Sequence, residues 1–393
     1  MTDTRVQEAV ALMNRFAERT GLTTGAPPQR YLWTDAFAVC NYLGLAHSTG
    51  DPHYTELALQ LVDQVHHTLG WHREDDKRTG WISGLDEADG ELHPTRGGLR
   101  IGKPLPERSP DEPRNEHTEW DRDGQYFHYL TRWMHALDQV ARDTHQSRFN
   151  AWARDLSYRA ADAFTYQPAS EWQPPRMVWK MSIDLTRVLV PSMGQHDPLD
   201  GYITNLQLRS TMADLSQPAA GPDLEAESGQ FAAMLKWGDW TTTDPLGLGG
   251  LMMDAYRLQQ VRQPGSTMDA QLLEKLLGAA ITGLQQYARS SALQQPAPYR
   301  LAFRELGLSI GLHAMVRMHA TLDDAAHTDA MSTSLRDRLD TLLQYLPLSD
   351  EIEAFWRNPE HQRTASWNDH QDINEVMLAT SLAPDGFLVL QPM

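Results

Sequence analysis

The sequence predicts an all-α protein built as a ring of six helical hairpins. Three observations support this fold class. Apolar residues recur at helical spacing along most of the 393 residues, amphipathic stretches alternate with more uniformly apolar stretches, and strand signals are few. In such an alternation the amphipathic helices form an outer layer, and the apolar helices form an inner layer that is covered on both sides.

The amphipathic stretches predict the outer helices. Val6, Val10, Met13 and Phe16 mark the first of them by their spacing. The outer helices are expected at residues 4–20, 54–69, 147–165, 199–216, 269–289 and 332–346.

The more uniformly apolar stretches predict the inner helices, and "YLWTDAFAVCNYLGLAH" is the clearest example. The inner helices are expected at residues 31–47, 119–142, 180–191, 240–259, 299–319 and 368–382. The alternative is an open helical-repeat solenoid, but the sequence has no consensus repeat of fixed period. The tail "GFLVLQP" predicts one short strand.

Residues 70–118 interrupt the helical pattern with many Gly and Pro residues. A connection of this length is functional, disordered or folded as a small subdomain. The interspersed Trp71, Trp81 and Ile101 favour an ordered excursion with a short β-hairpin. Because the excursion joins an outer helix to the second inner helix, we expect it to form a lid or wall over a pocket, within a single domain of residues 1–393.

The composition narrows the classes of partner. The chain has 34 basic and 52 acidic residues and a formal net charge of −18, so nucleic acid and anionic membranes are not expected as partners. Cys40 is the only cysteine, which excludes an intrachain disulfide. No signal peptide and no run of about 20 apolar residues is present, so a cytoplasmic protein is expected. The oligomeric state stays open.

Each predicted inner helix begins with a polar and aromatic cluster. The clusters are "RYLWTD", "EWDRDGQYFHY", "WKMSIDLTR", "KWGDWTTTD", "YRLAFRE" and "SWNDHQDINE". Inner helices of such a ring run parallel, so their N-terminal ends would gather at one mouth. Helix capping explains a carboxylate at a helix start, but it does not explain the Trp and Tyr residues.

Aromatic rings beside carboxylates and arginines favour a small carbohydrate as the ligand. A pyranose stacks its C–H face on an indole, and its hydroxyls hydrogen-bond with charged groups. The predicted substrate-binding residues are Arg30, Trp33, Trp81, Asp86, Trp120, Tyr126, Trp179, Lys180, Trp240, Arg300, Arg304, Asp369 and His370.

Hydrolysis of a glycoside would need two carboxyl groups across the scissile bond. Asp123 and Glu375 are the predicted pair, with Asp184 and Asp35 as rivals. An ion pair between Lys180 and Asp184, one helical turn apart, would lower the pKa of Asp184 and suit it to a base or structural role.

The segment "PSMGQHDPLDGY" is interpreted as a structural turn after the third inner helix. His196 and Asp197 would bind substrate only if this end of the helix lies at the pocket mouth. No zinc spacing, P-loop or dinucleotide motif is present, so no metal and no cofactor are expected.

The helix count, the alternation and the site-like loops resemble the (α/α)6 toroid of the six-hairpin glycosidase superfamily, without pointing to one family in it. The resemblance implies a carbohydrate-active enzyme, first of all a glycoside hydrolase. The alternative is a sugar isomerase or 2-epimerase on the same toroid, as in the N-acylglucosamine 2-epimerase group. His370 and His128 would then be the bases, with help from Arg30 or Arg304, although that group's own motif pattern is not found. A non-catalytic scaffold or ligand-binding protein is the third interpretation.

Overall fold

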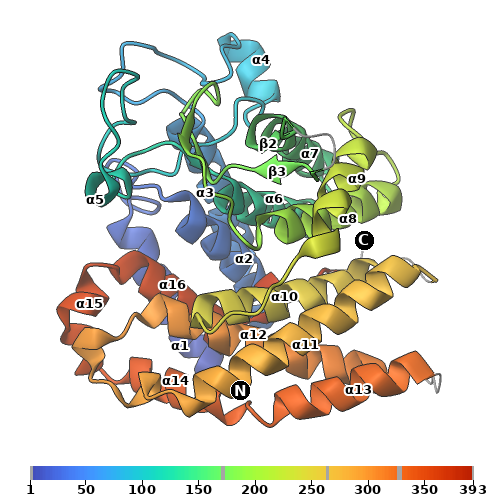
Figure 1. Cartoon of the computed structure of the whole chain (residues 1–393). Helices are drawn as coiled ribbons and strands as arrows, with labels where there is room; N and C mark the ends of the chain where they lie inside the picture. Colours follow the sequence, from blue (N-terminus) through green and yellow to red (C-terminus); the bar gives the residue numbers. More distant parts are fainter. Residues whose placement is uncertain (1–2, 170–172, 263–264, 325–329, 392–393) are drawn as a thin grey trace. The chain divides into compact units, whose positions relative to one another are not determined.

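The computed structural model describes residues 3–169, 173–262, 265–324 and 330–391 (Figure 1). These residues fold mainly into α-helices with a few short strands, so the predicted all-α class is confirmed. The chain divides into two compact units. We call residues 17–43 and 52–238, with the last three residues, the N-terminal unit, and residues 1–16, 44–51 and 239–390 the C-terminal unit. The predicted closure of the helices into one ring concerns both units together, and so does the predicted single domain. Both stay predictions.

The helices of the N-terminal unit follow the predicted ranges in most places. They are the first part of α2 (Leu32–Thr49), α3 (His53–Leu69), α4 (Glu87–Leu92), α5 (Glu116–Glu119), α6 (Phe127–Thr144), α7 (Ser147–Phe164), α8 (Asp197–Asp214) and α9 (Glu225–Met234). Helix α6 packs against α7 and α8, and it is buried along nearly its whole length. It is therefore an inner helix, as predicted.

A buried carboxylate connects these three helices. Asp138 on α6 accepts hydrogen bonds from Asn150 of α7 at 2.9 Å, and from Gln207 and Thr211 of α8 at 2.8 and 2.9 Å. Arg142, one turn along α6, adds a charged partner at 3.3 Å. A buried charge is stable only when it is hydrogen-bonded in this way, so the polar residues of the apolar inner helix fix its rotation.

The predicted helix over 180–191 is wrong. This stretch forms β4 (Lys180–Met181) and β5 (Val188–Val190), which pair antiparallel and extend from β1 (Gln125–Tyr126). The side chains of Asp184 and Ser182 accept hydrogen bonds from the backbone N–H groups of the turn, and Leu185 there has a φ of 60°. This local hydrogen bonding competes with a helix.

The predicted start of the second inner helix is also too early, because α6 begins only at Phe127. Asp123 and Gly124 precede β1. Gly124 has a φ of 148°, and a Cβ there would lie 2.7 Å from the Met181 carbonyl oxygen. Pairing of β1 with β4 therefore requires glycine at this position.

The excursion over 70–118 is ordered and carries α4 and α5. Its first part is closed by an antiparallel bridge between Trp71 and Trp81, and its second part by a parallel bridge between Leu105 and Arg122. In place of the short hairpin predicted here, the structure has only the isolated antiparallel bridge between Trp71 and Trp81. A second pair of short strands, β2 (Thr165–Tyr166) and β3 (Arg176–Met177), follows α7.

The C-terminal unit is also helical. It contains α1 (Thr4–Arg19) up to residue 16, the end of α2, α10 (Pro245–Val261), α11 (Thr267–Arg289), α12 (Ala302–Asp324), α13 (Ala330–Leu343), α14 (Pro347–Arg357), α15 (Ala365–Asn368), α16 (Gln371–Leu382) and α17 (Asp385–Leu388). Helix α12 packs against α10, α13, α14 and α16. Helices α9 and α14 were not predicted, and the predicted tail strand is wrong because residues 385–388 form a helical turn.

Candidate active site in the N-terminal unit

Three helices of the N-terminal unit begin close together. Trp33 lies in the first turn of α2, His128 in the first turn of α6, and Asp197 is the first residue of α8. The ring centres of Trp33 and His128 are 6.1 Å apart, and His128 Nδ1 lies 3.9 Å from Asp197 Oδ1. The gathering of helix starts that the sequence predicts is therefore present within this unit.

Aromatic rings surround His128. Tyr126 stacks on it with ring centres 5.4 Å apart, and Tyr129 meets it edge-on at 4.9 Å. Trp179, between β3 and β4, lies 6.1 Å from it. We call the whole group the aromatic–acid cluster, and its members are Tyr31, Trp33, Tyr126, His128, Tyr129, Arg132, Trp179, Asp197 and Asp200.

The proton position on His128 follows from its neighbour Trp179. The indole Nε1–H donates to His128 Nδ1 at 3.2 Å. Because an indole nitrogen only donates, Nδ1 must be the unprotonated nitrogen and Nε2 carries the hydrogen. Burial lowers the pKa of His128 to about 4, so the ring is neutral at neutral pH. The side chain is 27% exposed and presents an Nε2–H donor.

The pKa of Asp197 is shifted in the opposite direction from that of His128. Asp197 is 4% exposed, and one carboxyl oxygen has no hydrogen-bond partner among the described residues. Burial raises the pKa of Asp197 to about 7, with a further contribution from the charge of Asp200. The N–H of Gly194 and the charge of Arg132 oppose this rise. Asp197 is therefore a group that gains and loses a proton near neutral pH.

Asp200, one turn along α8, has partners that Asp197 lacks. It accepts from the Thr131 hydroxyl at 2.5 Å and lies 3.4 Å from Arg132 Nη1. The Arg132 guanidinium also lies over the Trp33 ring at 5.7 Å. The two aspartates of α8 thus have different environments, because Asp200 has a hydroxyl and a guanidinium as partners while one oxygen of Asp197 has no partner among the described residues.

The predicted catalytic residue Asp123 lies in a different environment. It is fully buried, accepts from Arg100 at 2.6 Å and Arg73 at 3.3 Å, and also accepts from backbone N–H groups of Gly102 and Gly124. These contacts tie the end of the excursion to the start of β1. The environment is that of an anchoring carboxylate, and the catalytic role of Asp123 stays a prediction.

The other predicted catalytic carboxylates also have partners. Asp35 is buried, pairs with Arg30 at 3.3 Å and accepts from the Tyr31 N–H at the start of α2. Glu375 in the C-terminal unit is buried and lies 3.4 Å from Arg15. Their catalytic roles also stay predictions.

The predicted ion pair between Lys180 and Asp184 is wrong, because the hairpin separates the two residues. Lys180 is buried and contacts Glu119 at 3.1 Å, whereas Asp184 pairs with Arg78 at 2.7 Å. Burial alone would raise the pKa of Asp184, but hydrogen bonds from Thr186 and Ser182, with the charge of Arg78, hold it at about 2. The predicted direction is right, but its cause is not Lys180.

Three of the predicted substrate-binding residues, Trp33, Tyr126 and Trp179, are members of the cluster. Trp120 is 47% exposed and meets Trp179 edge-on at 5.2 Å, so it extends the aromatic surface. Arg30 is buried and donates to the Thr20 carbonyl as well as pairing with Asp35.

Two other predicted residues, in the excursion, have structural contacts. The Trp81 ring packs 5.5 Å from Trp71, and Asp86 caps α4 through the Asp89 N–H.

The remaining predicted binding residues belong to the C-terminal unit. Trp240 is buried, and Arg300 is buried in an ion pair with Glu305 at 2.7 Å. Arg304 pairs with Asp244 at 2.7 Å, while Asp369 and His370 are exposed. Their predicted role in binding substrate stays a prediction.

Sequence reasoning missed Tyr129, Arg132 and Asp200, and it assigned Asp197 to a structural turn. The signal that identifies Asp197 is the Asp-Pro step. Pro198 lies at the first positions of α8, where proline favours a helix start, whereas the sequence analysis assigned its segment to a structural turn. The outer helix predicted at 199–216 is α8, which is largely buried, so α8 takes the place of the inner helix predicted at 180–191 and Asp197 lies at its N-terminal end.

Among the described residues, no group of three or more His, Cys, Asp or Glu side chains is placed to hold a metal ion. No helix in the described part of the chain is both long enough and apolar enough to cross a membrane.

Comparisons with known proteins assign no function to any residue of this chain. No protein-family model matches the sequence, and no curated protein matches it. Among solved structures, the chain is similar to cellobiose 2-epimerase from Spirochaeta thermophila DSM 6192, with a TM-score of 0.44 and 10% sequence identity. The match covers 89% of this chain and 86% of that chain. At this TM-score and identity, no residue role can be carried over from that enzyme.

Proposed function

We propose that this chain is a carbohydrate-active enzyme that moves protons on a sugar, with Asp197 as the acid/base group and the His128 Nε2–H as a hydrogen-bond donor. The observation that carries the proposal is the pairing of a carboxyl of pKa about 7 with a neutral imidazole 3.9 Å away. Efficient proton transfer needs a group whose pKa lies near the working pH.

The favoured reaction is sugar isomerisation or epimerisation. The Asp197 carboxylate takes the proton from the carbon beside the sugar carbonyl, and the C–H electrons move to the carbonyl oxygen. His128 donates its Nε2–H to that oxygen as negative charge develops there. Asp197 then returns the proton to the former carbonyl carbon. A hydrogen passes from the neighbouring hydroxyl oxygen to the former carbonyl oxygen, and the product is the isomeric sugar. Epimerisation would need a second proton donor on the other face.

The aromatic rings support a carbohydrate as the substrate. The half-buried Tyr129 and Trp179 supply apolar ring surface beside His128, Trp33 and Tyr126 pack as buried rings behind it, and Trp120 extends the surface toward solvent. A sugar has C–H faces that pack on such rings and hydroxyls that need the polar partners between them.

Glycoside hydrolysis is the second candidate, favoured by the raised pKa of Asp197. A general acid must be protonated before it can donate to a leaving oxygen, and Asp197 meets this requirement below about pH 7. Within the N-terminal unit, the second carboxylate would come from Asp35, Asp123 or Asp184, while the role predicted for Glu375 stays a prediction. Asp184 has the most exposed side chain of the four, at 31%.

The test is proton NMR of the protein in D2O with free aldoses, ketoses and short oligosaccharides. Deuterium entering the carbon beside the carbonyl, without cleavage, supports the isomerase. New anomeric signals from a cleaved linkage support the hydrolase, and the first anomer distinguishes inversion from retention. Binding without turnover across the panel would contradict both and leave the non-catalytic binding role.

A further inference from the structure

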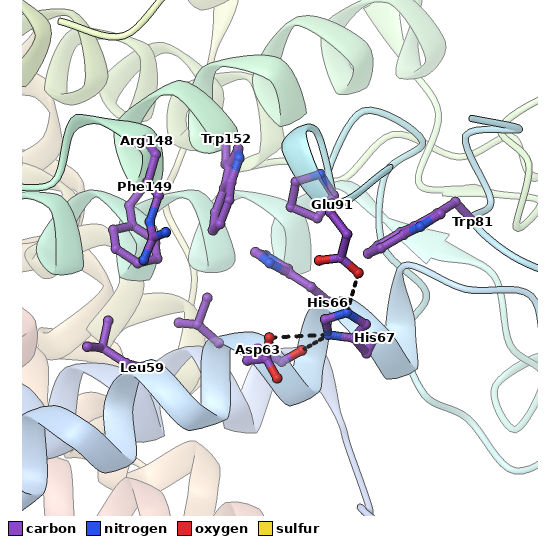
Figure 2. Close-up of a pocket in the computed structure, with 11 residues that line it drawn as sticks. Leu59, Asp63, His66, His67, Trp81, Glu91, Arg148, Phe149 and Trp152 are labelled. Carbon is purple, nitrogen blue, oxygen red and sulfur yellow. Dashed lines mark hydrogen bonds and ion pairs between the residues drawn. The ribbon is translucent and has the colours of Figure 1, made fainter. Parts of the chain in front are cut away.

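A cavity of about 210 Å³ lies in the N-terminal unit and contains no member of the aromatic–acid cluster. It is lined by side chains of α3, α4 and α7 and of the excursion, and Figure 2 shows how they surround it. Val62 and Phe149 are buried apolar parts of its wall, and Trp152 adds a half-buried indole. A dry cavity of about 150 Å³ with apolar walls is large enough to hold benzene, so this one has room for a six-membered ring with a substituent.

The cavity wall contains a hydrogen-bond donor that has no partner among the described residues. His66 is 3% exposed, and its Nε2 accepts from Trp133 Nε1 at 3.2 Å. The imidazole is neutral because burial lowers its pKa to about 3, so its remaining hydrogen is on Nδ1. No described residue accepts from that Nδ1–H. A water molecule or a ligand oxygen in the cavity can accept from this donor.

A cation without a carboxylate partner stands at the edge of the same cavity. Arg148 is exposed, and no described residue forms an ion pair with it. Its guanidinium lies 4.8 Å from the Phe149 ring centre and 5.6 Å from that of Trp152. The His66 ring lies 5.2 Å from the centre of the same Trp152 ring. One indole is therefore flanked by a free cation and by a free N–H donor.

The carboxylates of the lining are already paired. His67 contacts Glu91 at 2.7 Å and Asp63 at 3.3 Å. Burial alone would lower the pKa of His67, but its hydrogen bonds with Glu91 and with the Asp63 backbone raise it. Figure 2 shows this group on the side of α3 and α4, while Arg148 and Phe149 come from α7. An anion beside Arg148 would thus face a cation that is not neutralised within the described protein.

We propose that this cavity binds a small aromatic carboxylate, with its ring packed against Phe149 and Trp152 and its carboxylate accepting from Arg148 and His66. A guanidinium and an N–H donor match the acceptor-only chemistry of a carboxylate, and the rings match a flat apolar body. The site is separate from the proposed sugar chemistry and does not depend on it.

The experiment is a titration of the full-length protein with benzoate and with its neutral isostere benzamide, followed by tryptophan fluorescence and saturation-transfer NMR. Benzoate is expected to bind saturably with a Kd below about 1 mM, and benzamide about tenfold more weakly. Arg148→Gln should weaken benzoate binding about tenfold. Arg159→Gln, a change at a partly exposed position of the same helix that does not line the cavity, should leave it unchanged.

Two further variants separate the donor and the cavity from general effects on folding. His66→Phe keeps an aromatic ring but removes the N–H, and it should weaken benzoate binding in a protein whose circular dichroism is unchanged. Leu59→Trp, at a half-buried position of the lining, should fill the cavity and abolish binding. The proposal is overturned if benzoate shows no saturable binding up to about 10 mM, or if benzamide binds equally well. It is also overturned if Arg148→Gln keeps wild-type affinity for benzoate, or if glucose competes with benzoate for the cavity.

Discussion

At the residue scale, the environment of each carboxylate separates a reactive group from an anchoring one. Asp123 and Asp197 are both buried, yet Asp123 is surrounded by two arginines and backbone N–H groups, while Asp197 has an oxygen without a partner among the described residues. Sequence reasoning predicted that aromatic and charged residues at helix starts form the site. The structure brings Trp33, Tyr126 and Trp179 together around His128, although Trp179 lies between two strands, and their role as a site stays a prediction. Sequence reasoning could not rank the carboxylates, because most of their partners come from distant segments: those of Asp123 lie 21 to 50 residues away, and those of Asp184 and Glu375 lie 106 and 360 residues away.

Asp197→Asn is expected to lower turnover on the sugar substrate by about 100-fold or more, because an amide cannot exchange a proton. Substrate binding and the unfolding midpoint should change little, since the amide is isosteric. Steady-state kinetics with urea unfolding measures both. Asp63→Asn, an exposed change on α3, is the control, and wild-type turnover in Asp197→Asn would rule out the proposed role.

The pH dependence of turnover separates the two proposed reactions. An isomerase that uses the Asp197 carboxylate as base gains activity as the pH rises through about 7, because the base form accumulates. A hydrolase that uses the Asp197 acid loses activity over the same interval. A profile of kcat/KM between about pH 5 and 9 gives the sign, and a profile without an inflection near 7 would argue against both assignments.

Trp179→Phe is expected to lower kcat about tenfold while leaving KM nearly unchanged, because Trp179 positions the proton of His128 without being the reacting group. The 15N NMR signals of His128 should change from one tautomer to a mixture of two. Trp120→Phe leaves the hydrogen bond from Trp179 to His128 in place and serves as the matched control. Unchanged 15N signals in Trp179→Phe would show that another group fixes the tautomer.

At the scale of elements, helix periodicity predicted most helices but failed where local hydrogen bonds decide the structure. The stretch 180–191 has apolar residues that suit a helix or a buried strand, and the Ser182–Asp184–Thr186 turn selects the hairpin. That choice depends on pairing with β1, more than 50 residues earlier in the chain, which no local pattern shows. The start of α8 was misread for a different reason, because Pro198 both breaks and begins helices.

Asp138→Ala is expected to destabilise the protein by about 3 kcal/mol, because it leaves Asn150, Gln207, Thr211 and Arg142 without their shared acceptor. Urea unfolding followed by circular dichroism measures the loss. Asp162→Ala, an exposed residue on α7, should change the free energy of unfolding by less than about 0.5 kcal/mol. Equal effects of the two variants would show that the buried network contributes nothing specific.

At the scale of the whole molecule, buried neutral histidines predict a loss of stability in acid. The folded state holds the pKa of His66 at about 3, below its ordinary value of 6.5, so the unfolded chain binds a proton first as the pH falls. The stabilisation is complete above pH 6.5 and is lost as the pH falls toward 3, with a slope of about 1.4 kcal/mol per pH unit from this residue. His128 acts in the same direction with a smaller effect, because its side chain is partly exposed.

Urea unfolding at a series of pH values between about 4 and 7.5 tests this dependence. His66→Phe should flatten the slope by about one proton, whereas the exposed His53→Phe should not change it. A wild-type slope in His66→Phe would place the titrating group elsewhere.

The base of the excursion also determines which part of this protein can change during evolution. Asp123 and the two bridges fix the points where the loop leaves and rejoins the helices, so the course of the chain into Tyr126 does not depend on the outer part of the loop. Residues 109–111 and 113–115 are exposed, and lengthening a loop adds little closure entropy, about 0.6 kcal/mol per doubling. Insertions and exchanges in that stretch are therefore a low-cost way to vary the outer surface of the excursion, while the chain around Tyr126 and His128 keeps its course.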